Sequence, residues 1–295
     1  MENILEIRNL TKYYGKTLAV QNLSMELRKG EIFGFIGPNG AGKSTTIRSI
    51  LNLINKSSGE VLFEGKIFDK DSVSEKTKIG YLPSEIKLYE ELTVKQMLDF
   101  HESFYGINCR ERRNYLVDRL QLDESKKIED LSLGNMKKCG IVLALMHSPK
   151  LVILDEPTSG LDPIIQQRFY ELLLEEKEKG TTIFYSTHIL PEISKVCDRV
   201  GIIKAGKLLK VEGIHELKDK SLSFVTVTAK KHQEILEQLD VEATQTEGDT
   251  VTFKNTLNPN ELIQVLAEYD IEKIYIEQAS MEDIFIHYYE QGEEA

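Results

Sequence analysis

Hydrophobic residues in the first 215 positions alternate between short apolar segments and longer segments with helical spacing. Residues 32–36, 151–154 and 182–186 are each short and largely apolar, which predicts strands that are covered on both faces. Residues 163–179 begin with a proline and place apolar side chains three and four positions apart, which predicts a helix. Buried strands that alternate with helices predict an α/β fold with a parallel sheet.

The region from about residue 84 to residue 147 is predicted to be mainly helical, because its apolar residues recur at helical spacing. Ser132 is a favourable N-cap for the last of these helices. A helix that begins there would present backbone N–H groups to an anion.

The pattern changes after about residue 220, where short strands alternate with two short helices. Strands are predicted at 222–229, 241–246, 250–253 and 271–277, and helices at 233–238 and 260–268. The order strand–helix–strand–strand–helix–strand is that of a ferredoxin-like fold. We therefore predict a separate α+β accessory domain over residues 221–290, closed by an amphipathic helix that Ser280 caps.

A glycine-rich loop follows the first buried strand and precedes a segment with helical spacing. It comprises Gly37, Pro38, Asn39, Gly40, Ala41, Gly42, Lys43, Ser44 and Thr45. The glycines let successive backbone N–H groups point at an anion. Lys43 supplies a cation for the β- and γ-phosphates, and Ser44 supplies a hydroxyl for Mg²⁺. The sequence therefore predicts a nucleoside triphosphate site.

Ionisable side chains follow the other two buried strands. Asp155 and Glu156 end the strand at 151–154, and His188 follows the strand at 182–186. The carboxyl ends of parallel strands are where ligands bind in open α/β sheets. We expect Asp155 to join the Mg²⁺ shell and Glu156 to face water. For His188 the pattern alone also allows a purely structural role.

Two tyrosines and a glycine lie upstream of the phosphate loop. Tyr14 is the predicted aromatic platform for a purine ring, and Val20 is predicted to form an apolar floor beside it. An ordinary tyrosine at a strand edge is the alternative for Tyr14.

Composition is typical of a globular protein with a hydrophobic core and argues against one class of partner. Of its 295 residues, 41% are hydrophobic and 29% are charged, and no apolar run is long enough to cross a bilayer. The formal net charge of −11 argues against a nucleic-acid partner, because such a surface needs clustered lysine and arginine. The first residues lack the basic and apolar blocks of a secretory signal.

Five motifs occur in the order and spacing of the ATPase subunits of ABC transporters. They are the phosphate loop at 37–45, LSLGN at 131–135, LVILDEP at 151–157, SGLD at 159–162 and STH at 186–188. The chain resembles this family over about residues 1–215. The resemblance implies an ABC-type P-loop NTPase domain there, with a parallel core sheet, an antiparallel β subdomain and a helical subdomain at about 84–147.

The resemblance also implies roles for individual residues, with ATP and Mg²⁺ as ligands. Glu156 resembles the general base that polarises the attacking water, and His188 resembles the residue that holds the γ-phosphate. Asp162 resembles the residue that bridges two such domains. Ser132 and Gly134 would contact the γ-phosphate of the opposite subunit, so the active unit would be a head-to-tail dimer with two ATP molecules. The family has matching residues for the roles given above to Tyr14, Lys43, Ser44 and Asp155.

Two positions depart from the family pattern. Leu133 stands where the signature usually has glycine, and it adds bulk at the expected dimer interface. Ser84, in YLPSE, stands where the family has a glutamine that reaches Mg²⁺ and links the nucleotide to the membrane partner. Both variants and the C-terminal layout are similar to those of ATPases from bacterial ABC-2-type exporters, which move drugs, lantibiotics or other antimicrobial and amphipathic peptides.

We therefore predict an ATP-hydrolysing subunit at the cytoplasmic face of a bacterial membrane. Its predicted partners are separate membrane-spanning permease subunits and a second ATPase subunit, in a homodimer or a heterodimer. A non-transport ABC ATPase of ribosomes or DNA is a second hypothesis, although such relatives usually carry two cassettes or a long inserted coiled coil. A small-molecule kinase on a P-loop fold is a third, and it would make LSLGN and SGLD coincidences.

Overall fold

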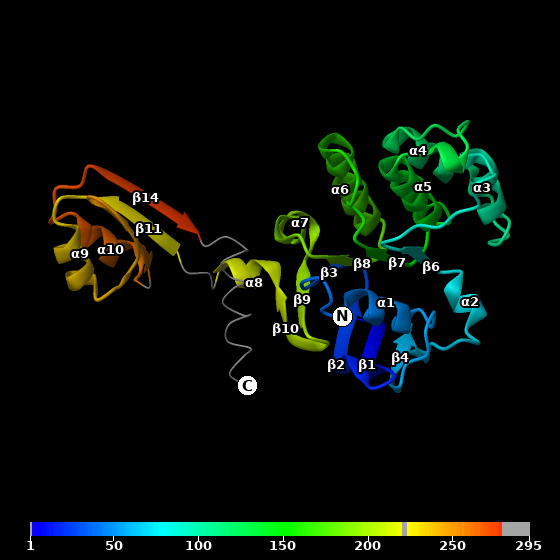
Figure 1. Ribbon diagram of the computed structural model, residues 1–295, viewed down its shortest axis with the longest axis horizontal. Helices are drawn as coiled ribbons and strands as arrows, with labels where there is room; N and C mark the ends of the chain where they lie inside the picture. The colour runs from blue at the N-terminus through cyan, green and yellow to red at the C-terminus, as the bar shows by residue number, and fades with distance from the viewer. Residues whose placement is uncertain (1, 220–222, 256, 279–295) are drawn as a thin grey trace. The chain divides into compact units, whose positions relative to one another are not determined.

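The computed structural model describes residues 2–219, 223–255 and 257–278 (Figure 1). The chain divides into two compact units, Met1–Ile214 and His215–Ala295. No helix in the described part of the chain is long and apolar enough to cross a membrane.

A six-stranded sheet forms the centre of the first unit, in the order β10-β9-β3-β8-β7-β6. Its bounds are β3 (Ile32–Ile36), β6 (Ile79–Leu82), β7 (Leu151–Asp155), β8 (Thr182–Thr187), β9 (Arg199–Lys204) and β10 (Lys207–Gly213). All neighbouring strands are parallel except β10, which pairs antiparallel with β9. Every residue of β3, β7 and β8 is buried, as expected for strands that are covered on both faces. The predicted parallel α/β core is confirmed.

Helices cover both faces of this sheet. Figure 1 shows α5 (Leu133–Leu145) and α6 (Pro163–Glu178) on one side and α1 (Lys43–Ile50) on the other. The short helix α7 (Leu190–Val196) follows β8. Asp162 caps α6 by accepting from two backbone N–H groups, and Pro163 supplies a pre-formed first turn.

An antiparallel sheet of order β2-β1-β4-β5 packs beside α1. Its strands are β1 (Asn3–Tyr14), β2 (Thr17–Arg28), β4 (Ser58–Phe63) and β5 (Lys66–Ile67), and the short helix α2 (Val73–Lys76) follows. Their inward residues share one core with the parallel sheet and with α1: Leu5, Ile7, Leu23, Phe33, Phe35, Ile47, Ile50, Val61, Phe63, Ile153 and Phe184. The phosphate loop is therefore attached to a densely packed base.

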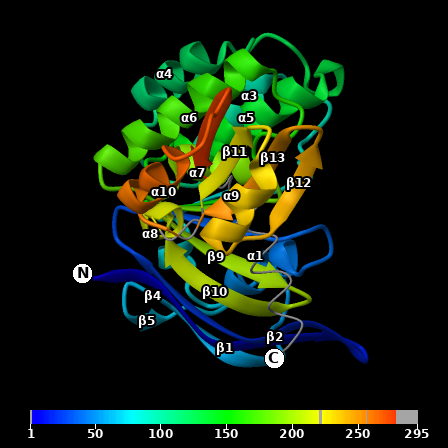
Figure 2. The ribbon, with the colours of Figure 1, turned by 90° about the vertical axis from the view of Figure 1, so that its left-hand side faces the viewer.

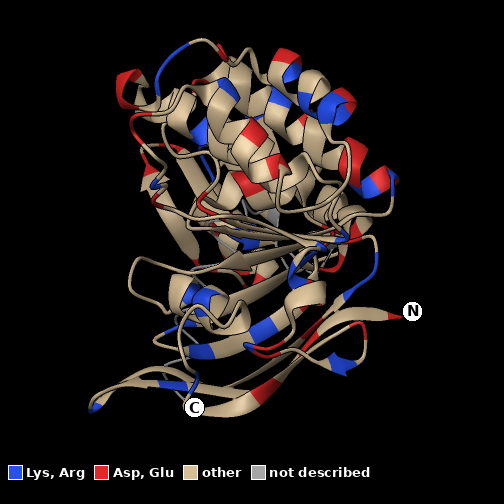
Figure 3. Cartoon of the chain, turned by 90° about the vertical axis from the view of Figure 1, so that its right-hand side faces the viewer, with Lys and Arg blue, Asp and Glu red and all other residues tan. Residues whose placement is uncertain are grey.

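A helical segment lies between β6 and β7. It contains α3 (Val94–Glu102), α4 (Arg110–Leu120), a 3₁₀ turn (Ile128–Asp130) and α5. Thr93 and Gln96 form a reciprocal capping box at the start of α3. Figure 3 shows lysine and arginine interspersed with aspartate and glutamate over the helices. In β3, β7 and β8, by contrast, the one charged residue is Asp155.

The second unit contains a four-stranded antiparallel sheet of order β12-β13-β11-β14. Its elements are α8 (Ile214–Asp219), β11 (Ser223–Thr228), α9 (His232–Leu239), β12 (Ala243–Glu247), β13 (Thr250–Asn255), α10 (Pro259–Leu266) and β14 (Lys273–Gln278). Residues of α9 and α10 pack on the inward side chains of β11 and β13, and Figure 2 shows β11, β13 and β12 side by side. This is the predicted ferredoxin-like order. The helix predicted after Ser280 lies outside the described residues.

Candidate functional site

The phosphate loop joins β3 to α1, and its glycines are required by backbone conformation and close packing. Gly40 and Gly42 have φ values of 81° and 106°, in the left-handed region that favours glycine. A Cβ on Gly37 would lie 2.3 Å from the backbone oxygen of Ile203. The turn therefore brings successive backbone N–H groups to the N-terminus of α1, where the helix dipole favours an anion.

Lys43 is the first residue of α1 and is 6% exposed. Its Nζ donates to the backbone oxygen of Gly37 at 2.7 Å and to that of Pro38 at 3.2 Å. The same Nζ lies 3.5 Å from Oε1 of Glu156. The loop thus holds its cation in place before any phosphate binds.

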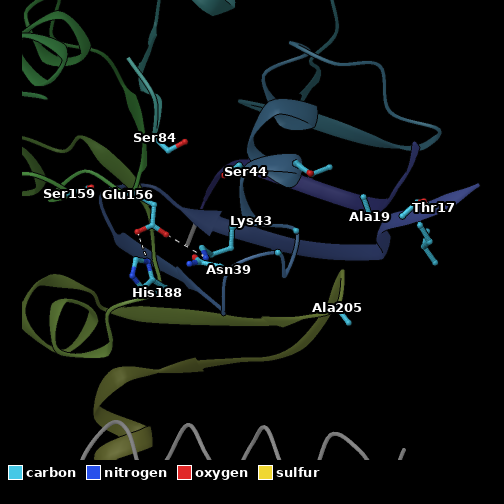
Figure 4. Close-up of a pocket in the computed structure, with 14 residues that line it drawn as sticks. Thr17, Ala19, Asn39, Lys43, Ser44, Ser84, Glu156, Ser159, His188 and Ala205 are labelled. Carbon is cyan, nitrogen blue, oxygen red and sulfur yellow. Dashed lines mark hydrogen bonds and ion pairs between the residues drawn. The ribbon is translucent and has the colours of Figure 1, made fainter. Parts of the chain in front are cut away.

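Glu156 follows β7 and lies between a cation and an imidazole. Figure 4 shows its carboxylate between Lys43 and His188, with a dashed line to each. His188 Nδ1 lies 2.7 Å from Oε2 of Glu156. Because a carboxylate only accepts hydrogen bonds, this contact places a hydrogen on Nδ1. The end of β7 and the end of β8 are thereby joined through side chains.

Asp155 is the last residue of β7 and is completely buried. Neither of its carboxylate oxygens has a hydrogen-bond partner among the residues that the structure describes. Burial raises the pKa of Asp155, and the hydroxyls of Ser44 and Ser186 partly oppose that rise. A carboxylate with free lone pairs beside a serine hydroxyl is a donor set that fits Mg²⁺.

A cavity of about 610 Å³ opens over these groups. Besides the phosphate loop, Glu156 and His188, its lining comes from four separate parts of the chain: Thr17, Leu18 and Ala19, then Ser84, then Ser159, and then Ala205. Figure 4 shows Ser84 and Ser159 near Glu156, and Thr17 and Ala19 on the far side of Ser44.

The chain matches a recognised protein family. Residues 20–159 match the family described as ABC transporter. The bacitracin transport ATP-binding protein of Bacillus licheniformis is 34% identical over 297 residues, which cover 97% of this chain and 97% of that protein. The chain belongs to the ATP-binding proteins of ABC transporters.

This ABC ATPase is also similar to a second named relative and to a solved structure. The linearmycin resistance ATP-binding protein of Bacillus subtilis is 39% identical over 213 residues, covering 70% of this chain and 68% of that protein. A solved ATP-binding subunit of an ABC transporter superposes with a TM-score of 0.69 at 30% identity, covering 74% of this chain and 92% of that one. The protein therefore binds and hydrolyses ATP.

On the predicted adenine side of the ABC ATPase, the structure places two residues outside the cavity lining. Val20 is fully buried in the core that the antiparallel sheet shares with α1 and the parallel sheet. Ala19, one position earlier, lines the cavity instead. Tyr14 ends β1, is 48% exposed, and has Lys12 Nζ 4.9 Å from its ring centroid. Strand alternation does not mark the lining residues of β2, because Thr17, Leu18 and Ala19 are consecutive.

The signature residues of the ABC ATPase lie apart from the cavity lining. Ser132 caps α5 by accepting from the backbone N–H of Asn135 at 3.3 Å. Gly134 packs so closely that a Cβ would lie 2.6 Å from the backbone oxygen of Gly160. Leu133, between them, is 67% exposed. The start of α5 is thus an open helix terminus with an exposed apolar side chain.

A buried carboxylate that sequence reasoning did not single out supports the site from behind. Glu192 of α7 is 4% exposed and accepts four hydrogen bonds from hydroxyls. The donors are Thr158, Tyr170, Tyr185 and Thr187. Burial, together with the charge of Glu192, raises the pKa of both tyrosines. The network fixes the residues directly before Ser159 and His188.

Proposed function

We propose that this ABC ATPase powers export of an antimicrobial peptide or drug through separate membrane-spanning subunits, at the cytoplasmic face of the membrane. The support for the cargo is that its relatives are named for bacitracin transport and linearmycin resistance. The observation that carries the catalytic part is the Glu156 carboxylate, which lines the cavity and lies between Lys43 and His188.

Glu156 is the proposed general base. Its carboxylate takes the proton from the water that attacks the γ-phosphorus. A bound Mg²⁺ ion would supply positive charge beside the phosphates. Asp155 and Ser44 are the residues that would hold the ion. When ATP binds, Lys43 exchanges the carbonyl oxygens of Gly37 and Pro38 for phosphate oxygens, which are stronger acceptors.

His188 is the proposed partner of the γ-phosphate. The contact between Nδ1 and Glu156 orients the ring and places it next to the proposed base. Its side chain is 47% exposed, which leaves the imidazole accessible to a nucleotide.

A head-to-tail dimer is part of the proposal. Ser132 and Gly134 lie outside the lining of this chain's own cavity, and the exposed Leu133 stands between them. In the dimer they would meet the ATP of the second subunit, whose identity decides between a homodimer and a heterodimer. Tyr14 would stack on adenine beside Thr17 and Ala19.

Purification with its membrane-spanning subunits and reconstitution into liposomes tests this function. We expect a bacitracin-like peptide to stimulate ATP hydrolysis, and we expect Glu156→Gln to lower hydrolysis by about 10²-fold while ATP still binds. The mutant should accumulate as an ATP-bound dimer by light scattering. Near-normal hydrolysis in Glu156→Gln would contradict the base assignment. Failure of any membrane-spanning protein to co-purify would contradict the transport assignment.

A further inference from the structure

Lys137 of α5 is a buried cation that the mechanism above does not use. It is 1% exposed and is among the largest fully buried side chains of the described residues. Its Nζ donates to the backbone oxygen of Ser84 at 3.0 Å and to the backbone oxygen of Glu156 at 3.1 Å. An ammonium group is costly to bury, so a lysine that points inward to two carbonyl oxygens needs an explanation.

Both carbonyl oxygens belong to residues that line the nucleotide cavity. Ser84 lies in the loop after β6, and Glu156 directly follows β7. Strands β6 and β7 are neighbours in the parallel sheet. Lys137 therefore bridges two adjacent strand ends at the edge of the sheet where ATP binds.

The backbone of Glu156 is in an unfavourable conformation that this contact supports. Its φ is 52°, in the left-handed region that residues with a Cβ seldom adopt. The N–H of Glu156 donates to the backbone oxygen of Ser186 at 2.9 Å, on β8. Its carbonyl oxygen accepts from Lys137 on the other side. The backbone of Glu156 is thus held through its N–H and through its carbonyl group.

We propose that Lys137 is a positioning residue for hydrolysis: it locks the strained backbone of Glu156 and ties it to the loop at Ser84. The proposal rests on the proposed role of Glu156 as the base. The loop at Ser84 lacks the long polar arm expected there, and Lys137 supplies a direct link from α5 to both strand ends. The charges of Asp155 and Glu156 oppose the lowering of the pKa of Lys137 by burial, and so favour its charged form.

Steady-state hydrolysis of Mg²⁺-ATP by the full chain tests this role. Lys137→Met keeps length and apolar volume but removes both donated hydrogen bonds. We expect kcat to fall by roughly 10- to 100-fold, because a displaced catalytic group costs that much, while KM and the Kd of a fluorescent ATP analogue stay within about twofold. Lys138→Met is the matched control on the same helix, and we expect it to stay within about twofold of wild type.

A double mutant separates positioning from general support of the fold. In the Glu156→Gln background, Lys137→Met should lower the remaining rate by less than about twofold, because the group that it positions is already disabled. Lys137→Gln, which keeps an amide donor, is compared in both backgrounds, so a poorly folding Lys137→Met does not prevent the test.

The outcomes are distinct. An unchanged kcat in Lys137→Met, or parallel losses of kcat and ATP affinity, would overturn the proposal, as would full multiplicative loss in the double mutant. A normal rate in Glu156→Gln alone would instead overturn the base assignment of the proposed function.

Discussion

Two buried carboxylates of the same unit, Asp155 at the end of β7 and Glu192 in α7, have opposite surroundings. Asp155 accepts no hydrogen bond from the described residues, whereas Glu192 accepts four. A buried carboxylate without hydrogen-bond partners lowers the free energy of unfolding. A buried carboxylate whose hydrogen bonds are all made does not carry that cost. The difference is the one expected if Asp155 holds the proposed Mg²⁺ ion while Glu192 stabilises the fold. Substitutions at the two positions should therefore have different signatures.

Asp155→Asn should have the largest effect on activity and should not destabilise the fold. We expect hydrolysis to fall by about 10²-fold or more, because the substitution removes the proposed charged ligand of Mg²⁺. The nucleotide-free chain should melt at a similar temperature, because the substitution removes a buried carboxylate that has no hydrogen-bond partner but also removes its attraction to Lys43 and Lys137. Hydrolysis assays and thermal melts on one preparation check this. A marked drop in melting temperature would assign Asp155 to the scaffold instead.

Glu192→Gln should show the reverse balance. An amide replaces one oxygen with a donor, which faces hydroxyl groups that now lack an acceptor. We expect a loss of about 2–3 kcal/mol in unfolding free energy, which is the cost of leaving buried hydroxyls unpaired. Urea denaturation measures it. ATP affinity should change little, so a variant that loses nucleotide binding but keeps its stability would break the comparison.

His147 extends the comparison to a buried base. Its ring is stacked on Tyr105 with centroids 4.0 Å apart, and neither ring nitrogen has a hydrogen-bond partner in the described part of the chain. Burial, aided by the charge of His101, lowers the pKa of His147 to about 4. The unfolded chain therefore binds the proton more readily, and stability present above about pH 6.5 is lost as the pH falls toward 4.

His147→Phe should reduce that acid sensitivity. Between pH 7.5 and pH 5.0 the wild type should lose about 2 kcal/mol more unfolding free energy than the variant. Denaturation at the two pH values measures the difference, with Lys138→Met as an unrelated control. Equal pH dependence in both proteins would show that His147 is not the group responsible.

Ser84→Ala should have the smallest effect. A serine side chain ends one bond beyond Cβ, so water rather than the hydroxyl is expected to complete the contact with Mg²⁺. The link to Lys137 uses the backbone oxygen of Ser84, which alanine retains. We expect at most a threefold loss of turnover, or less than about 1 kcal/mol. Damage equal to that of Asp155→Asn would make Ser84 a direct metal ligand.

The parts of this molecule that sequence could predict are those where local pattern decides. The burial of β3, β7 and β8 can be predicted from the apolar residues of each strand alone. The glycines before Lys43 are required by the backbone geometry of a single turn. The ferredoxin-like order followed from turn positions and periodicity.

Residues whose environment depends on distant elements were not predictable in the same way. Val20 and Ala19 are neighbours in sequence, and which of them faces the cavity depends on the register of β2. Lys137 occupies a polar stretch that resembles a solvated helix face, and only the packing of α5 against the ends of β6 and β7 buries it. Glu192 likewise acquires its four donors from three other segments.

Helix α5 carries Ser132 at its N-cap and Lys137 five residues later, about 7.5 Å along the axis. In the proposed dimer, the first turn of α5 would contact the nucleotide of the other subunit. Lys137 donates a hydrogen bond to the backbone of Glu156 in its own subunit. In such a dimer, one helix of each subunit would contact both nucleotide sites. ATP dependence should then be sigmoidal in the wild type and closer to hyperbolic in Lys137→Met, which makes α5 a source of cooperativity.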